Sequence, residues 1–292
     1  MKTVRTVDDL RREVSAARGR AGATMPGVAD VIGLVPTMGY LHEGHLSLVD
    51  RARERTDFVV MSNFVNPTQF GPGEDFEEYP RDPERDAELA EARGVDLVYA
   101  PATEVVYPDG EPVVKVVPGP LAERLCGLTR PGHFQGVLTV VAKLFGMVQP
   151  DVAVFGRKDY QQAVLIRQMV RDLDMPVRVE AAPIVREQDG LALSSRNAYL
   201  SEAERARARS LSQGLFAARS VFEDEGVTNA DRLKARVRGT MRDADVEPEY
   251  IELVDPETLD ELDEARAGAV LAVAARVGDT RLIDNVILGQ QS

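Results

Sequence analysis

The chain has 292 residues, 44% of them hydrophobic and 28% charged, proportions that are ordinary for a globular protein of one large or two smaller domains. Its 35 basic and 48 acidic residues leave a net charge of -13 at pH 7. This charge argues against a general nucleic-acid or membrane-surface binder, because both need a basic face. A local basic pocket on an acidic protein could still bind a nucleotide.

Several absences narrow the protein class further. No apolar run approaches the roughly 20 residues that span a bilayer, and the first residues contain no apolar signal core. Cys126 is the single cysteine, so an intramolecular disulfide or a cysteine metal cluster is excluded. The sequence therefore predicts a cytoplasmic enzyme.

Short apolar runs alternate with helical patterns through the first part of the chain. Strands are predicted at 31–35, 57–62, 95–100, 152–155 and 177–180. Helices are predicted at 44–56, 82–93, 136–148 and 160–173. This alternation indicates parallel βαβ units, which bind ligands at the carboxyl ends of their strands.

The pattern changes near residues 184–190, where turn residues gather. Ser201 and Glu204 form a capping box that begins a long helix over 202–223. A helix near 229–243 and strands at 250–254 and 269–274 follow. We therefore expect two domains, a Rossmann-like α/β domain over 1–185 and a smaller α+β domain over 186–292.

His42 and His45 share a glycine-rich segment, 36–45, that directly follows a predicted strand and precedes a predicted helix. A strand, a glycine turn and a helix N-terminus together bind phosphate through backbone N–H groups and the helix dipole. Two imidazoles add donors that can neutralise charge developing on phosphate. A zinc site is the alternative, because histidines at i and i+3 can share a metal if a third ligand exists. The remaining alternative is that the two histidines lie in a polar loop with no ligand.

Four more polar segments are candidates for binding. Asn66 and Gln69 carry amides that can bind hydroxyls and carboxylates, although Asn is also common in structural turns. Within the charged segment 77–86 a carboxylate could hold Mg²⁺, although charge runs are usually solvated faces. Lys158 can meet a phosphate, Asp159 is a plausible helix cap, and Gln162 would lie in the first helical turn and face the same mouth as Gln69.

The fourth of these segments, Ser194-Ser195-Arg196-Asn197, lies on a turn between the expected domains. Hydroxyls and a guanidinium on a mobile loop suit a lid over phosphates. The alternative is that the segment is only a polar linker between the domains. The segment 132–136, which contains His133 before the helix at 136–148, has no role that its chemistry alone indicates.

Taken together, these segments resemble the pantothenate synthetase family (pantoate–β-alanine ligases). The matching motifs are Pro-Thr-Met-Gly-x-Leu-His-x-Gly-His at 36–45, Asn-Pro-Thr-Gln-Phe-Gly at 66–71, Tyr-Pro-Arg at 79–81, Gly-His-Phe-x-Gly-Val at 132–137, Phe-Gly-x-Lys-Asp-Tyr-Gln-Gln at 155–162 and Ser-Ser-Arg-Asn at 194–197. Any one motif is weak, but six in the family's order are highly specific. They cover about residues 30–200.

The resemblance implies an H-x-G-H nucleotidyltransferase fold with a C-terminal lid domain, assembled as a homodimer. It implies the ATP-dependent condensation of (R)-pantoate with β-alanine through a pantoyl-adenylate, with AMP and diphosphate as products and Mg²⁺ accompanying ATP. No protein nucleophile is needed, and phosphoryl-type transfer is catalysed mainly by positioning and charge stabilisation.

The family's motifs also assign residues. The ATP set is Met38, Gly39, His42, Gly44, His45, Gly156, Lys158, Asp159, Val185, Ser194, Ser195 and Arg196. Its catalytic members are His42, His45, Lys158, Ser194, Ser195 and Arg196. The pantoate set is Pro36, Met38, Gln69 and Gln162. Asp86 would be the Mg²⁺ carboxylate, although Arg85 interrupts a run that is consecutively acidic in some relatives. Arg157 stands where many relatives have Glu.

Two rival functions stay open at this point. A cytidylyl- or adenylyltransferase would use the same turn but transfer the nucleotide to a phosphate, whereas Gln69 and Gln162 favour a small hydroxy acid as the acceptor. A non-catalytic nucleotide-binding module is the other rival, and the intact His42, His45 and Lys158 argue against it.

Overall fold

The structure is a computed structural model that describes residues 1–24 and 31–290. Two compact units make up the chain. The first contains Met1–Gly119, Arg130–Gly156 and Leu165–Ala182, and the second contains Pro120–Thr129, Arg157–Val164 and Pro183–Ser292. The last division falls close to the expected one at 185/186, but two earlier segments that were expected in the first domain belong to the second unit. Within the described residues, no helix is both long and apolar enough to cross a membrane.

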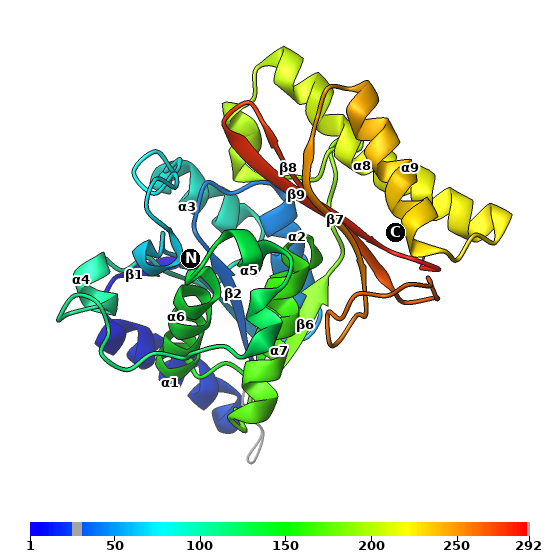
Figure 1. The fold of residues 1–292 in the computed structure, drawn as a ribbon. Helices are drawn as coiled ribbons and strands as arrows, with labels where there is room; N and C mark the ends of the chain where they lie inside the picture. The colour runs from blue at the N-terminus through cyan, green and yellow to red at the C-terminus, as the bar shows by residue number, and fades with distance from the viewer. Residues whose placement is uncertain (25–30, 291–292) are drawn as a thin grey trace. The chain divides into compact units, whose positions relative to one another are not determined.

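The first unit is built on a six-stranded parallel sheet in the order β1-β4-β3-β2-β5-β6 (Figure 1). Its strands are β1 (Lys2–Val4), β2 (Ile32–Thr37), β3 (Phe58–Asn63), β4 (Leu97–Tyr99), β5 (Val152–Gly156) and β6 (Arg178–Ala182). The order reverses between β2 and β5, which pair directly. Open parallel sheets bind ligands at the carboxyl ends of the strands at such a reversal. The predicted α/β fold is confirmed, including the parallel strands.

Helices cover this sheet because their apolar stripes match its buried side chains. They are α1 (Val7–Thr24), α2 (Glu43–Arg53), α3 (Pro83–Ala92), α4 (Thr103–Val106) and α6 (His133–Val148), with α7 (Tyr160–Asp172) shared by the two units. Leu46 and Val49 of α2 pack against Val35 and Val59 of the sheet. Figure 1 shows α1 beside α6, where Arg11 donates to a carbonyl near the end of α6. Helix α6 begins at His133, three residues before the predicted start.

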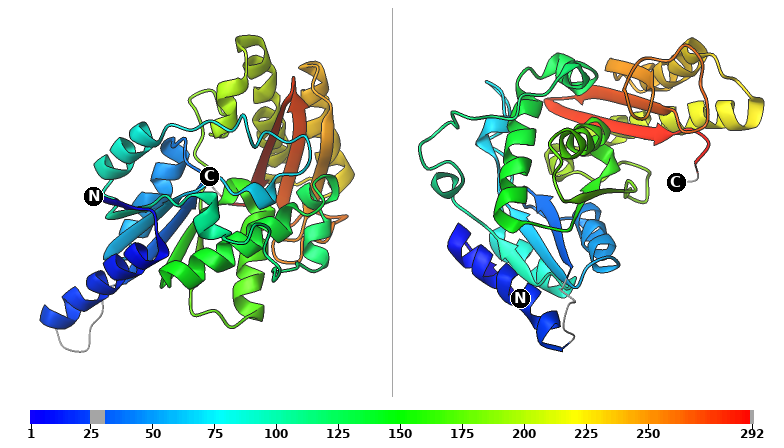
Figure 2. Two further views of the ribbon diagram at one scale, coloured as in Figure 1. Left: turned by 90° about the vertical axis from the view of Figure 1, so that its left-hand side faces the viewer. Right: turned by 90° about the horizontal axis from the view of Figure 1, so that it is seen from below.

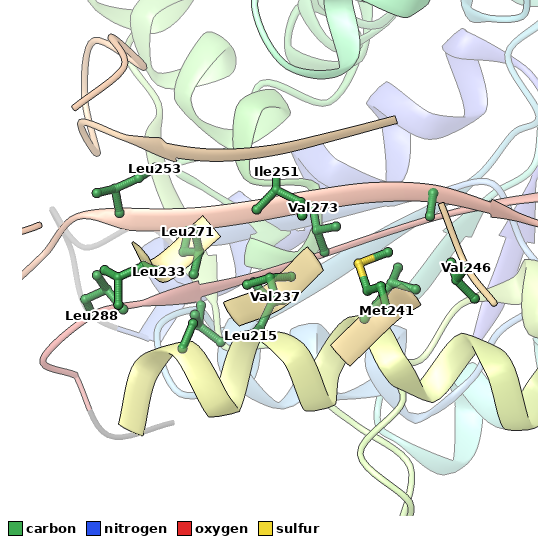
Figure 3. Close-up of a cluster of buried hydrophobic side chains, with 14 of the residues drawn as sticks. Leu215, Leu233, Val237, Met241, Val246, Ile251, Leu253, Leu271, Val273 and Leu288 are labelled. Carbon is green, nitrogen blue, oxygen red and sulfur yellow. The ribbon is translucent and has the colours of Figure 1, made fainter. Parts of the chain in front are cut away.

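The second unit contains the antiparallel sheet β7-β8-β9. Its long elements are α8 (Glu202–Glu225), α9 (Ala230–Asp243), β7 (Pro248–Val254), β8 (Val270–Val277) and β9 (Thr280–Ile287). Both helices lie on one side of the sheet (Figure 2). Figure 3 shows Leu215 of α8 and Val237 of α9 packed with Ile251 and Val273 of the sheet. The predicted capping box of α8 is present at Ser201.

The other face of the three-stranded sheet explains why two early segments belong to this unit. Residues alternate in direction along a strand, so Val270 and Ala272 point away from α8 and α9. They pack instead with Leu125, Val164 and Leu259, all of which are buried. Leu125 lies next to α5 (Cys126–Thr129) and Val164 lies in α7. The second unit therefore includes the turn that carries Lys158.

Candidate active site

The turn between β2 and α2 presents both histidines of the first motif. His42 is the N-cap of α2, and its Nδ1 accepts a hydrogen bond from the backbone N–H of Gly44 at 3.1 Å. The ring of His42 stacks on that of His45, with the centroids 4.0 Å apart. The two imidazoles therefore lie together at the N-terminus of a helix, where the dipole favours an anion.

The hydrogen bond at His42 determines which nitrogen can act on a ligand. A ring nitrogen that accepts a hydrogen bond carries no proton, so the neutral imidazole of His42 has its proton on Nε2. Nε2 is then the nitrogen of this ring that carries a donor proton. A zinc ion would instead need an unprotonated nitrogen.

The carboxylate of Asp86 anchors the same turn. Its Oδ2 accepts from the N–H of Tyr40 at 2.8 Å, and its Oδ1 accepts from the N–H of Leu41 at 2.7 Å. The Asn63 amide also donates to Oδ2, at 3.0 Å. Asp86 is 3% exposed, so these three donors supply the compensation that a buried carboxylate needs. Its position in α3 gives it a role in shaping the histidine turn.

Gly39 is required where the turn passes this carboxylate. Its φ is +80°, and a Cβ there would lie 2.3 Å from Oδ1 of Asn63 and 2.8 Å from Oδ2 of Asp86. A side chain would therefore be strained in its backbone and would also displace the anchor.

No protein metal cage accompanies these groups in the part of the chain that the structure describes. Over residues 1–24 and 31–290, no three His, Cys, Asp or Glu residues gather as metal ligands would. The zinc alternative for His42 and His45 therefore has no third ligand there. A Mg²⁺ role for Asp86 stays a prediction, and its bonds to the turn fit a structural anchor better.

The second motif contains a short helix, η1 (Pro67–Gln69), which follows β3 after three residues. Asn66 is 1% exposed, and its amide donates to Oε1 of Gln69 at 3.1 Å. Tyr107 donates its hydroxyl proton to Oδ1 of Asn66 at 2.8 Å. Nε2 of Gln69 lies 3.2 Å from Sδ of Met38. Of the two predicted amides, Asn66 thus has a structural role, and Gln69 lies beside Met38.

The segment 132–136 supports η1 from α6. A Cβ on Gly136 would lie 2.1 Å from the carbonyl oxygen of Thr68 and 2.7 Å from the backbone nitrogen of Gln69, so only glycine permits this approach. Nδ1 of His133 lies 2.8 Å from the carbonyl oxygen of Gln69. The motif whose role the sequence did not reveal therefore seats the loop of Gln69.

In the second unit, η3 (Arg157–Asp159) carries Lys158 just after β5. The amide of Asn285 in β9 donates to the carbonyl oxygens of Arg157 and Lys158, both at 3.0 Å. Asn285 is 4% exposed. Lys158 Nζ lies 3.8 Å from Oδ2 of Asp159. Asp159 directly precedes α7, and its role as the cap of that helix stays a prediction.

Asp284, the neighbour of Asn285, holds the next segment of the site. Its carboxylate accepts two hydrogen bonds from Arg186, at 2.6 and 2.9 Å. Burial raises the pKa of Asp284, and the guanidinium of Arg186 opposes that rise. Arg186 directly follows Val185, whose carbonyl accepts from the N–H of Leu193 at 3.0 Å. The turn with Val185 is therefore fixed within the second unit.

The serine segment is a short helix, η4 (Ser195–Tyr199), rather than the expected loop. Ser194 caps it by accepting from the N–H of Arg196 at 3.3 Å. Asn197 donates to Oε1 of Glu187 at 3.1 Å, and Glu187 is itself paired with Arg205. The helix forms because these side chains satisfy the backbone and amide groups of the segment. Motion of the segment as a lid stays a prediction.

The two adjacent glutamines at the start of α7 differ in burial. Gln161 is 4% exposed and donates to the carbonyl oxygens of Leu121 and Arg124, at 2.9 and 2.7 Å. Gln162 is only partly buried and lies in the first turn of α7, as predicted. A ligand can therefore reach Gln162 more easily than Gln161.

The predicted site residues divide between the two units. The first unit contains Pro36, Met38, Gly39, His42, Gly44, His45, Gln69, Asp86 and Gly156. The second unit contains Lys158, Asp159, Gln162, Val185, Ser194, Ser195 and Arg196. Sequence reasoning missed the residues that hold them, namely Tyr107, Arg130, Arg186, Asp284 and Asn285. Most of their contacts join residues far apart in sequence, such as Tyr107 with Asn66 and Asn285 with Lys158, so no local spacing indicates them. Arg130 also lies only three residues before His133, but its pairing with Glu74 spans 56 residues.

Comparisons with known proteins give a consistent family. The family model described as pantoate-beta-alanine ligase matches residues 2–287. A pantothenate synthetase from Acetivibrio thermocellus is 48% identical over 289 residues, which cover 99% of each chain. One from Thermus thermophilus is 51% identical over 286 residues, which cover 98% of this chain and 99% of the relative.

Solved structures agree with these relatives. A crystal structure of pantothenate synthetase from Thermus thermophilus aligns with a TM-score of 0.89 at 49% identity, covering 98% of this chain and 99% of that one. The pantoate-beta-alanine ligase of Francisella tularensis, complexed with beta-gamma ATP and beta-alanine, aligns with a TM-score of 0.80 at 31% identity. That match covers 100% of this chain and 99% of the other.

Proposed function

The chain belongs to the pantoate–β-alanine ligase family. We propose that it joins (R)-pantoate to β-alanine in two steps. In the first step, a carboxylate oxygen of (R)-pantoate attacks the α-phosphorus of ATP, and diphosphate leaves. In the second step, the amine of β-alanine attacks the carbonyl carbon of the pantoyl-adenylate. AMP leaves with the former carboxylate oxygen, and the amine loses a proton to solvent.

The geometry of the histidine turn carries the proposal. Negative charge must be stabilised around the α-phosphorus and on the departing diphosphate, and fixed donors supply this best. Nε2–H of His42, together with His45 at the start of α2, offers such donors. The anchor at Asp86 keeps the turn in place without reorganisation.

Lys158 and the serine segment supply the remaining phosphate contacts in this proposal. Lysine meets a phosphate as a point charge, and Asn285 binds the carbonyl oxygens of Arg157 and Lys158 so that they do not face the anion. Ser194, Ser195 and Arg196 would add hydroxyl and guanidinium donors. Gly156, Asp159 and Val185 would contact the nucleoside part of ATP, with Met38, Gly39 and Gly44.

Pantoate would bind through amides and an apolar wall. Gln69 and Gln162 can donate to and accept from its hydroxyl and carboxylate groups. Met38 and Pro36 would contact its methyl groups, and the contact of Met38 with the Gln69 amide places two of these residues together. Selectivity for a hydroxy acid follows, because an acid without the hydroxyl would leave an amide unpaired.

Mg²⁺ would enter with ATP and neutralise charge on the phosphates. The described residues do not form a protein cage for it, which suits a cation that keeps most of its waters and binds phosphate. None of the roles given to the protein residues above depends on where that ion lies. The Asp86 carboxylate would reach it only if its bonds to the turn allowed.

The homodimer and the cytoplasmic location remain predictions. For the homodimer, the candidates for a contact with a second copy are three exposed valines. Val113 is 98% exposed, Val114 87% and Val117 74%. Burying such side chains is favourable. Light scattering of the Val114→Asp variant should then show monomer where the wild type shows dimer. Leu173→Asp, an exposed apolar position elsewhere, is the control and should leave the dimer intact.

An omission assay on the full chain tests the proposed reaction. With ATP, Mg²⁺, (R)-pantoate and β-alanine, AMP and diphosphate should accumulate over many turnovers. Without β-alanine, AMP release should stop, and without pantoate no diphosphate should form. Transfer of the nucleotide to a phosphate acceptor, or binding of ATP with no turnover, would contradict the proposal and favour one of the two rival functions.

A further inference from the structure

Three connected side chains bind the backbone of Gln69, whereas Met38 contacts its side chain. His133 lies 2.8 Å from the Gln69 carbonyl oxygen through Nδ1. NH1 of Arg130 lies 3.0 Å from Nε2 of the same ring. Arg130 also donates to both oxygens of Glu74, at 2.7 and 2.6 Å. The three residues thus form one continuous connection, Glu74–Arg130–His133, that ends on the backbone of Gln69.

The partners of the imidazole fix its tautomer. A carbonyl oxygen only accepts hydrogen bonds, so Nδ1 of His133 must carry the proton that it shares with Gln69. A guanidinium only donates, so Nε2 must be unprotonated and accept from Arg130. His133 is therefore a neutral imidazole with one orientation, and Arg130 determines that orientation.

Glu74 keeps Arg130 in place. The Arg130 and Glu74 side chains are only 16% and 24% exposed. Oε2 of Glu74 also accepts from the N–H of Gly71 at 3.1 Å, which ties the carboxylate to the loop that follows Gln69. Burial would raise the pKa of Glu74, but the hydrogen bonds and charge of Arg130 outweigh it and lower the pKa to about 2. Glu74 therefore stays ionised at neutral pH.

The side-chain amide of Gln69 is held as well, so it has little freedom. Asn66 donates to Oε1 of Gln69, and Sδ of Met38 lies against Nε2. A shift of the Gln69 backbone would break these contacts together. A displacement of about 1 Å at a binding group can cost a large part of its effect.

We propose that Glu74, Arg130 and His133 are positioning residues that fix the backbone of Gln69 and so set the affinity for the hydroxy acid. This inference rests on the proposed role of Gln69 in binding pantoate. The three residues act through Gln69, and His133 takes no part in proton transfer.

Two substitutions at His133 separate the two ends of the ring. The amide nitrogen of Asn occupies the place of Nδ1, and that of Gln the place of Nε2. His133→Asn therefore keeps a donor for the Gln69 carbonyl, whereas His133→Gln places its amide toward Arg130 instead. With the full chain, we expect the pantoate KM to stay within about threefold of wild type for Asn and to rise about tenfold for Gln, since 1.4 kcal/mol of lost binding is tenfold. The ATP KM should stay within about twofold for both.

A second pair of variants keeps the test decisive if His133→Gln folds poorly. Glu74→Gln should raise the pantoate KM by about threefold, and combining it with His133→Asn should give less than the product of the single effects, because the residues act in one chain. Equal pantoate KM values for His133→Asn and His133→Gln would overturn the proposal. The proposal would also be overturned if the double variant raised the pantoate KM by the full product of the single effects. A loss of kcat in both His133 variants at unchanged pantoate KM would overturn it as well.

Gln69→Ala separates this inference from the function on which it rests. A wild-type chain that forms no pantoate-dependent diphosphate would contradict the proposed function, and the inference with it. If Gln69→Ala raises the pantoate KM while His133→Gln does not, the ligase proposal stands and the positioning proposal is wrong. A rise in both variants supports the connection from Glu74 to Gln69.

Discussion

The two strand-to-helix turns that carry the phosphate-binding candidates are anchored by opposite chemistry. After β2, the carboxylate of Asp86 accepts from the backbone N–H groups of Tyr40 and Leu41. After β5, the amide of Asn285 donates to the backbone carbonyls of Arg157 and Lys158. Asp86 thus occupies backbone hydrogen-bond donors of the first turn, whereas Asn285 occupies backbone acceptors of the second.

This difference determines what each turn can offer to ATP. At the histidine turn, the N–H groups of Tyr40 and Leu41 are bound to Asp86, so the proposed phosphate contacts would come from the imidazoles and from α2 itself. At the lysine turn, the carbonyl oxygens that would repel a phosphate are bound to Asn285, which leaves the ammonium group as the main feature. In the proposed reaction, donors for the transition state and charge for the ground state would therefore come from separate turns.

The largest effects should come from the groups that each turn presents. His45→Ala and Lys158→Ala should each lower turnover by roughly 10²–10³-fold, the usual effect of removing a donor to a developing charge. Far-UV circular dichroism should not change, because His45 lies in the first turn of α2 and Lys158 in the short helix η3, both at the ends of elements rather than in the core. Lys234→Ala, a lysine that pairs with Glu252 in the second unit, should keep full activity. Loss of secondary structure in either site variant would contradict the assignment.

Breaking the first anchor should cost stability and turnover together. Asp86→Asn keeps the shape but replaces one acceptor oxygen with an NH₂ group that faces a backbone N–H. A buried mismatch of this kind costs about 1–3 kcal/mol, which chemical denaturation can measure. A variant with unchanged stability but a raised Mg²⁺ requirement would instead support the metal role predicted for Asp86.

Breaking the second anchor should have a smaller and more selective effect. Asn285→Ala leaves two carbonyls without their donor, at about 1 kcal/mol each. The ATP KM should rise several-fold, because Lys158 is less well held, while the pantoate KM should change little. Gln168→Ala, which removes an exposed amide on α7, is the matched control. An equal change in both KM values would show that Asn285 does not act through Lys158.

The smallest effect concerns the loop of Gln69 and depends on pH. The pKa of Glu74 is lowered from 4.5 to about 2 in the folded chain, so its stabilising contribution is present above pH 4.5 and is lost as the pH falls toward 2. A partly exposed pair contributes about 1 kcal/mol or less, or roughly 2 °C in Tm for a chain of this size. Glu74→Gln should therefore melt slightly lower than wild type at pH 7 and equally near pH 2.

Glu77→Gln, an exposed position in the same segment, is the control for this measurement and should match wild type at both pH values. A Tm difference between wild type and Glu74→Gln that persists unchanged near pH 2 would show that the ion pair with Arg130 is not its cause.

Most of the fold was predictable because its strands are short, apolar and separated by amphipathic helices. Two of the exceptions have physical reasons. β1 has three residues, too few to show a pattern. β9 contains Arg281, Asp284 and Asn285, whose polar groups find partners such as Arg186 only in the folded chain.

The candidate site was predictable where a motif carries the chemistry and was not where distant residues support it. The histidines and Lys158 belong to recognisable turns. Asp86 was singled out as a metal ligand, but its distance of 45 residues from Leu41 hid its bond to the turn. Asn285 lies 127 residues from Lys158, and no local pattern connects them.

The route of one oxygen atom tests the central claim that pantoate is activated as an adenylate. If the carboxylate attacks the α-phosphorus, pantoate labelled with ¹⁸O in its carboxyl group should pass one labelled oxygen to AMP during turnover with β-alanine. Mass spectrometry of the AMP would measure this directly. Label in inorganic phosphate with ADP as the nucleotide product, or AMP without label, would contradict the account.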